Sequence, residues 1–127
     1  MYGANAYNVY KSNSVNLASR DQLLLMILDG AVKFSKISRQ AILDKDMKKA
    51  HESLVRTQDI FVELMSSLNM DAGEWAQKLM SVYEFINYKL VQANLKKDIR
   101  ELDEAIPLIE ETRDMWYEAN KLAKGGI

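Results

Sequence analysis

Four long segments of this chain repeat their apolar residues with the 3.6-residue period of an α-helix, and short stretches of turn residues separate them. This pattern predicts amphipathic helices, each with one apolar stripe for a shared core. Because short connections make consecutive helices antiparallel neighbours, we predict an all-α, antiparallel up-down four-helix bundle with a short N-terminal segment or helix packed on it. A chain of 127 residues fits one domain, 1–127. The predicted arm covers 1–16, and the predicted helices cover 19–43, 46–68, 73–95 and 98–123.

Local signals set the predicted ends of the helices. Ser19 and Gln22 have the spacing of a capping box, which satisfies free N–H groups in the first turn of a helix. Asp46 is the predicted N-cap of the second helix. Pro107 removes a backbone N–H and clashes with the preceding turn, so we expect a kink or a short break between Asp103 and Pro107.

The apolar period also predicts which side chains face the core. The inner positions are Leu24, Ile27, Leu28, Ala31, Phe34, Ile37 or Ser38, Ala41 and Ile42 in the first helix, Met47, Ala50, Leu54, Phe61, Leu64, Met65 and Leu68 in the second, Trp75, Leu79, Val82, Ile86, Leu90 and Ala93 in the third, and Leu102, Ile106, Ile109, Trp116 and Ala119 in the fourth.

Two helices carry more apolar residues than one core stripe of roughly 100° requires. Either the N-terminal arm or a neighbouring helix buries this surplus, or it forms a surface for a partner helix, and the sequence leaves these alternatives open. Seven Met and many Leu residues are typical of an adaptable groove for an apolar helix. The surplus residues are Leu23, Leu25, Met26 and Val32 in the first helix, and Tyr88, Val91 and Leu95 in the third.

Composition and motifs argue against chemistry. The chain has no Cys and one His, His51, which has no Glu three residues before it as a di-iron bundle would require. Phosphate-binding loops and nucleophile-elbow motifs are absent. We therefore expect no enzyme activity, cofactor or metal. The formal net charge of −1 gives no basic face for nucleic acid.

The same sequence leads us to expect a cytosolic protein. Its first residues lack the basic and apolar regions of a secretory signal. The longest apolar run extends from Leu23 to Leu28, well short of the roughly 20 residues of a membrane span, so we expect no membrane insertion.

Several strings of residues together resemble the flagellin-specific export chaperone family (FliS), over nearly the whole chain. The most specific are Asp29-Gly30-Ala31 in the first helix and Leu90-x-Gln92-Ala93-Asn94-x-x-x-Asp98 at the end of the third. Further matching positions are Ala6–Tyr7, Ser19, Leu23, Met26–Leu28, Asp59–Phe61, Glu63–Leu64, Ser67–Asn69, Leu79, Tyr83, Phe85–Ile86 and Trp116.

The resemblance implies an antiparallel helical bundle that binds the C-terminal region of newly made flagellin in the cytosol. Such chaperones prevent premature polymerisation and deliver flagellin to the flagellar type III export gate. Their client segment is disordered when free and folds into helices along the chaperone. In the family, an N-terminal segment containing Tyr lies over part of the client groove. Tyr7 matches that position, and Tyr10 is a second aromatic nearby.

We predict that flagellin lies across the first and third helices. The apolar anchors would be Leu24 and Leu28 on one helix and Tyr88, Val91 and Leu95 on the other, although Leu24 is also a core candidate. The amides of Gln92 and Asn94 could pair with a peptide backbone, or Asn94 could instead cap the third helix. Asp29 and Gly30 are expected to be structural, with Gly30 allowing close helix approach.

Two other functional classes stay open at this point. The bundle could sequester a flagellar regulator, such as an anti-sigma factor or a translational regulator of flagellin, or it could be an enzyme with an unfamiliar site. An exposed apolar groove would also favour weak self-association.

Overall fold

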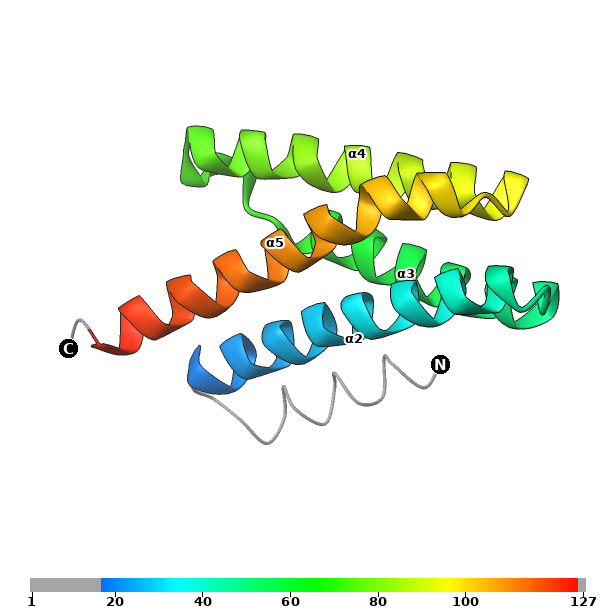
Figure 1. Cartoon of the computed structure of the whole chain (residues 1–127). Helices are drawn as coiled ribbons and strands as arrows, with labels where there is room; N and C mark the ends of the chain where they lie inside the picture. Colours follow the sequence, from blue (N-terminus) through cyan, green and yellow to red (C-terminus); the bar gives the residue numbers. More distant parts are fainter. Residues whose placement is uncertain (1–16, 126–127) are drawn as a thin grey trace.

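The computed structural model describes residues 17–125, and it confirms the predicted all-α bundle. The described elements follow each other closely along the chain, with a 3₁₀ turn, η1, between the second and third helices (Figure 1). The predicted arm, 1–16, lies outside the described residues. The elements are α2 (Leu17–Leu43), α3 (Met47–Ser67), η1 (Met70–Ala72), α4 (Glu74–Lys96) and α5 (Ile99–Gly125).

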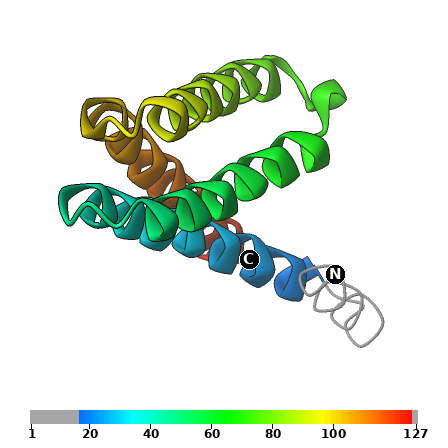
Figure 2. The same ribbon diagram turned by 90° about the vertical axis from the view of Figure 1, so that its right-hand side faces the viewer.

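The four helices are arranged as a ring around one core. Helix α2 packs against α3 and α5, and α4 packs against the same two helices. Figures 1 and 2 show α2 and α4 on opposite sides of the molecule, with α3 and α5 between them. Each helix therefore has one buried side and two flanks, and each flank of α4 borders a different neighbour.

The turns are built from polar caps and left-handed backbone. Asp46 is the N-cap of α3, as predicted, and its Oδ1 accepts a hydrogen bond from the Lys49 backbone N–H at 3.1 Å. Gly73 has φ of 129°, which a residue with a side chain adopts only with strain, and this allows η1 to turn directly into α4. Before α5, Asp98 Oδ1 accepts from the Arg100 N–H at 2.9 Å, and the Arg100 guanidinium holds the pKa of Asp98 below its usual value.

Two predicted helix boundaries are wrong. Helix α2 begins at Leu17, so Ser19 lies inside the helix and is not its N-cap. Helix α5 continues through Pro107, so the predicted alternative of a short break is wrong, while a kink there stays a prediction. Pro107 leaves the Asp103 carbonyl without its helical donor, but both residues are exposed and water can supply the missing bond.

Most predicted inner residues are confirmed, including Leu54, Phe61, Ile86, Leu90 and Leu102, none of which is exposed. The errors concern side chains beside the true inner stripes. In α4 the stripe is rotated by one residue, so that Ala76 and Tyr83 are buried in place of Trp75 and Val82. The exposed residues wrongly placed inside are Met47, Trp75, Val82 and Ala119, whereas Leu25, Val32, Ala76 and Tyr83 are buried.

Tyr83 shows why the inner stripe of α4 is rotated. Its ring packs edge-on against Phe61 with centroids 5.9 Å apart, and its hydroxyl accepts a hydrogen bond from Trp116 Nε1 at 2.9 Å. Burial raises the pKa of the Tyr83 hydroxyl. A large residue with a satisfied polar end therefore occupies the centre of the core, and Trp75 and Val82 are turned toward the α5 flank.

Candidate functional site

The described part of the chain offers little for chemistry. No cluster of His, Cys, Asp and Glu side chains between residues 17 and 125 is arranged to hold a metal ion. An open depression of about 390 Å³ lies between α2 and α5, but an ion pair crosses it, with Arg39 Nε 2.6 Å from Asp103 Oδ1.

Among residues 17–125, no helix is both long and apolar enough to span a bilayer.

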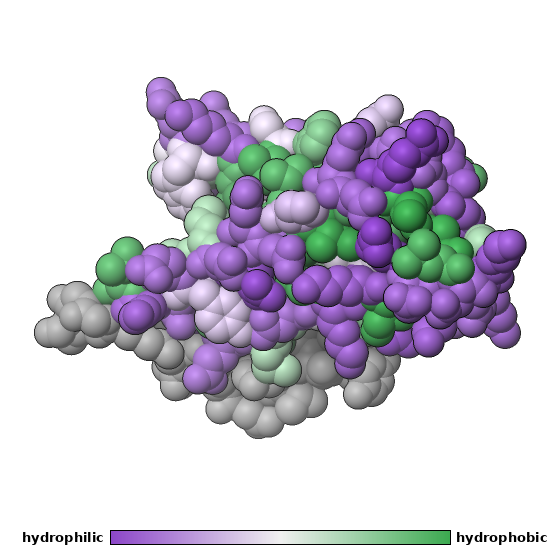
Figure 3. All heavy atoms as spheres, viewed as in Figure 1, coloured by the Kyte–Doolittle hydropathy of each residue, from purple (hydrophilic) through white to green (hydrophobic). Residues whose placement is uncertain are grey.

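Exposed apolar side chains concentrate on α4. They lie on both flanks of its buried stripe, and Figure 3 shows hydrophobic patches between polar side chains on the face where α5 passes in front of α4. Leu95 is 76% exposed and Tyr88 is 56% exposed, which is high for large apolar side chains. The exposed set on this helix is Trp75, Val82, Phe85, Tyr88 and Leu95.

A polar network joins α4 to α3. Asn94 Oδ1 accepts a hydrogen bond from Lys97 Nζ at 2.7 Å and lies 3.2 Å from His51 Nδ1. Asn94 Nδ2 donates to Gln58 Oε1 at 3.4 Å. These contacts place one flank of α3, marked by His51 and Gln58, directly beside the Asn94 flank of α4.

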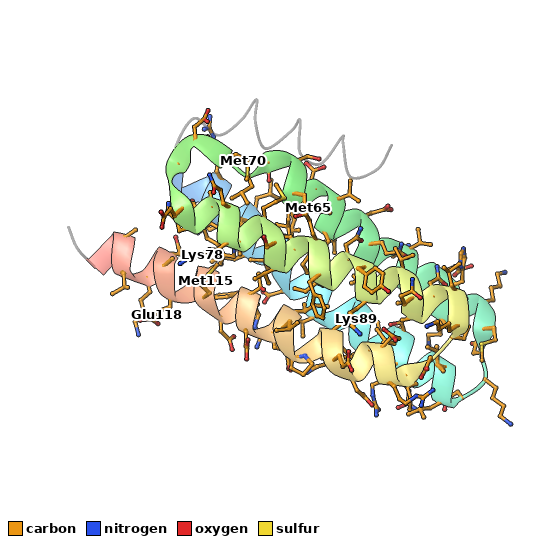
Figure 4. All side chains as sticks on the ribbon, turned by 90° about the horizontal axis from the view of Figure 1, so that it is seen from above. Met65, Met70, Lys78, Lys89, Met115 and Glu118 are labelled. Carbon is orange, nitrogen blue, oxygen red and sulfur yellow. The ribbon has the colours of Figure 1, made fainter. Side chains whose placement is uncertain are left out.

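Apolar residues lie next to this network on both helices. Val55 and Val62 are one turn to either side of Gln58, so they share its flank, and they are 36% and 51% exposed. On α4, Val91 is one turn before Asn94 and is half-buried, with exposed neighbours one turn away on each side. We name as the α3–α4 surface the residues Val55, Val62, Tyr88, Val91 and Leu95. Met65 and Met70 extend its apolar side chains toward η1 (Figure 4).

An unsatisfied amide lies beside this surface. Asn87 precedes Val91 by one turn, and its Oδ1 is buried without a hydrogen-bond partner among the described residues. A buried acceptor left without a donor costs about 1–3 kcal/mol. The polar groups near the α3–α4 surface are therefore the amides of Gln58, Asn87 and Asn94 together with His51 and Lys97, and amides can pair with a peptide backbone.

The predicted anchors on the first helix do not form part of a surface. Leu28 is 0% exposed and belongs to the core, so its assignment as a client anchor is wrong for the free protein. Leu24 is half-buried and packs against the same core, which favours its alternative core role. Tyr7 and Tyr10 lie outside the described residues.

Tyr88, Val91 and Leu95 lie along one side of α4, whereas Gln92 and Asn94, two residues apart, lie on opposite sides of that line. Gln92 is half-buried and lies one turn from both Tyr88 and Leu95. Asn94 is not the helix cap, because the residue with left-handed backbone at the end of α4 is Lys97, with φ of 51°. Whether Gln92 and Asn94 contact a client remains a prediction.

Three residues of this region were missed in the sequence. Val55 and Val62 are seven residues apart and off the inner stripe of their helix, and that spacing could have marked them as a second apolar line. Asn87 carries no such signal, because only the packing of α3 against α4 leaves its oxygen unpaired.

Comparisons with known proteins agree with this architecture. The family model described as "Flagellar protein FliS" matches residues 3–123. A "Flagellar secretion chaperone FliS" from Bacillus subtilis is 36% identical over 115 residues, 91% of this chain and 86% of that protein. One from Vibrio cholerae is 31% identical over 84% of this chain and 82% of that protein.

A solved structure described as "Crystal structure of flagellar chaperone from bacteria" has a TM-score of 0.74 and 16% identity, covering 94% of this chain and 98% of the other, and so shares the fold. The four-helix bundle and the match across nearly the whole chain lead to one assignment: this protein belongs to the FliS family, a family of flagellar chaperones and not of enzymes.

Proposed function

We propose that this chain is a cytosolic export chaperone that binds the C-terminal region of flagellin along the α3–α4 surface. In this role it prevents flagellin from polymerising prematurely and assists its delivery to the flagellar type III secretion apparatus. The observation that carries the proposal is the line formed by exposed Tyr88 and Leu95 with half-buried Val91 between them. This line runs beside Val55 and Val62 without a covering element among the described residues.

The geometry suits an amphipathic helix as the client. Tyr88, Val91 and Leu95 are spaced by three and four residues, so they project along one line for about two turns. A client helix laid beside this line would bury its own apolar stripe at the same spacing. Each Å² of apolar area removed from water contributes about 25 cal/mol. Summed over the whole contact, this free energy must exceed the cost of ordering the client segment.

The amides provide a reason for specificity. A client N–H that reached Gln92, which is half-buried, would gain a hydrogen bond to its amide carbonyl oxygen. Occupation of the apolar side of the client would keep that side from contacting a second flagellin. This is the physical basis on which we propose that binding prevents polymerisation.

The direct test is a double substitution, Val91→Asp with Leu95→Asp. Carboxylates facing an apolar client would be desolvated without a partner, so we expect affinity for flagellin to fall at least about a hundredfold. Co-purification with flagellin and the mass of the complex measure this, and far-ultraviolet circular dichroism verifies the fold. Val82→Asp is the matched control, because Val82 is an exposed residue on the α5 flank of the same helix, on the side opposite Val91. Flagellin binding at wild-type affinity by the double variant would refute the α3–α4 surface.

We also propose that Tyr7 and Tyr10 belong to an arm that covers part of the client surface and moves aside. Deletion of the residues before Asn16 should then increase the association rate of flagellin, measured by stopped-flow fluorescence. An unchanged or slower association would rule out a removable cover without affecting the site on α3 and α4.

A further inference from the structure

The α3–α4 surface has unlike charges at its two ends. On α3, Lys48 precedes Val55 by seven residues, as Val55 precedes Val62, so all three follow one line along the helix. On α4, Glu84 precedes Val91 by the same interval. Because α3 and α4 run in opposite directions, as Figure 2 shows, Lys48 and Glu84 lie toward opposite ends of the surface.

The basic end lies where α3 begins and α4 ends, and we define it by Lys48, His51 and Lys97. Lys97 Nζ donates to the Asn94 carbonyl oxygen at 2.5 Å and to Asn94 Oδ1 at 2.7 Å, which holds the ammonium at the end of α4. An ammonium has three N–H donors, so one is left for a partner. His51 Nδ1 lies 3.2 Å from the same Asn94 oxygen, and Lys48 is one turn before His51.

The acidic end lies toward η1, and we define it by Glu84 and Asp71. Glu84 is exposed on α4 one turn before Tyr88, and Asp71 is exposed in η1. Two cations at this level of the bundle lie on other flanks. The Arg56 guanidinium is 5.2 Å from the centroid of the Phe34 ring of α2, and Lys78 lies between α4 and α5 (Figure 4).

The charges at the two ends are not used within the described part of the chain. No member of the basic end or the acidic end forms an ion pair with any residue between 17 and 125. Two carboxylates near the basic end do not cancel it. Asp98 is already paired with Arg100, with oxygen and nitrogen 3.0 Å apart, and Glu52 lies farther round α3 from α4 than Val55 does.

We propose that these charges set the direction of the client: its helix lies parallel to α4, with its C-terminal end at Lys48, His51 and Lys97 and its N-terminal end at Glu84 and Asp71. The inference rests on the proposed function and adds the polarity with which flagellin binds. A helix carries about half a negative elementary charge at its C-terminus and about half a positive one at its N-terminus. This direction therefore places both ends of the client beside opposite charges, and the reverse direction places both beside like charges.

The length of the surface suits this selection. Lys48 and Val62 are 14 residues apart, which corresponds to about 21 Å along a helix. A client helix of about 14 residues would thus have one end at each charged end, and the influence of a helix dipole is strongest within the first and last turns. The dipoles of α3 and α4 themselves largely cancel, because the two helices are antiparallel. The side-chain charges are therefore what distinguishes the two directions.

Disulfide cross-linking tests the direction, because the chain has no cysteine of its own. Met47→Cys places a thiol at the basic end and Ser66→Cys places one toward the acidic end, about 28 Å apart along α3. The client is the shortest C-terminal flagellin fragment that binds the wild-type chain, with one cysteine added at its first or its last residue. At low ionic strength we expect the last residue to join Met47→Cys at least about tenfold more than Ser66→Cys, and the first residue to show the opposite preference. Equal or reversed yields overturn the inference.

A charge exchange tests the cause of the direction. Lys48→Glu combined with Glu84→Lys keeps the net charge and alters two exposed side chains, so we expect it to lower the cross-linking preference at least about threefold. An unchanged preference would show that these charges do not set the direction. Circular dichroism verifies that the variants fold.

The Val91→Asp and Leu95→Asp double substitution separates this inference from the proposed function. When it is added to each cysteine variant, it should abolish both cross-links. Cross-links that persist would mean that flagellin lies elsewhere, and the proposed function and this inference would then fail together. Cross-links that are lost in the double variant, but that show no preference between Met47→Cys and Ser66→Cys without it, would leave the α3–α4 surface in place and overturn the direction alone.

Discussion

Helices α2 and α4 both have more apolar residues than one core stripe needs, yet they use the surplus differently. Among its described side chains, α2 exposes only Met26 and Leu43 as large apolar residues, whereas α4 exposes five. Leu25 and Val32, which the period placed outside the core stripe, are 8% and 6% exposed. The surplus of α2 therefore stabilises the fold, and that of α4 is available for partners.

The side chains between the helices explain this difference. The buried side of α2 contains Ala31, Ser35, Ser38 and Ala41, which are small and allow α3 and α5 to approach closely. In α4 the centre of the buried side is filled by Tyr83, Ile86 and Leu90, which hold the neighbouring helices farther from its flanks.

The largest expected effect comes from truncating a leucine on each helix. Leu28→Ala on α2 should lower the free energy of unfolding by about 2–5 kcal/mol, because it leaves a cavity in the core. Leu95→Ala on α4 should change it by less than about 0.5 kcal/mol, since the side chain is 76% exposed. Urea denaturation measures both. Equal losses of stability would contradict the difference in burial between Leu28 and Leu95.

A charged residue introduced on each helix tests whether flagellin binds to the exposed apolar side chains of α4 and not to those of α2. Tyr88→Asp and Met26→Asp alter side chains of nearly equal exposure, 56% and 59%. We expect Tyr88→Asp to weaken flagellin binding at least about tenfold, and Met26→Asp to change it by less than about threefold. Isothermal titration with a C-terminal flagellin fragment gives the affinities. A reversed order would move the client surface from α4 to α2.

Buried polar groups provide a third comparison. In α2 the Ser35 hydroxyl donates to the Val32 carbonyl at 2.9 Å, whereas Asn87 Oδ1 of α4 has no partner among the described residues. Asn87→Leu should therefore raise the free energy of unfolding by about 1 kcal/mol, and Ser35→Ala should not raise it. Thermal and urea unfolding report both changes. Loss of stability in Asn87→Leu would indicate that its amide is satisfied in solution.

The smallest expected effect concerns Gly30 of α2. The sequence suggested that glycine is needed there for close helix approach, but an added Cβ would lie 3.6 Å from Ile60 Cδ1, an ordinary contact distance. Gly30→Ala should thus stabilise the protein by about 0.5–1 kcal/mol through helix propensity. A decrease in melting temperature would show that α2 and α3 are closer than this distance implies.

Much of the fold could be predicted because helix periods are local. The turn at Asp46 and core residues such as Phe61 and Leu90 followed from spacing and residue type. The rotation of α4 did not, because Trp75 and Val82 are as apolar as the residues that replace them inside. On the candidate site, Tyr88 and Leu95 were predicted as exposed anchors, whereas Leu28 was placed there wrongly and Val62 was missed.

The amino-acid sequence by itself determined the four helices, their antiparallel order and the absence of recognisable catalytic motifs, because periodicity, short connections and residue types express these directly. Only the tertiary structure decided which apolar lines are covered. Burial of a helix flank depends on how closely its neighbours approach, and that distance is set jointly by side chains on different helices. For this reason Leu25 and Val32 of α2 are in the core, while large apolar side chains of α4 stay exposed on both sides of its buried stripe.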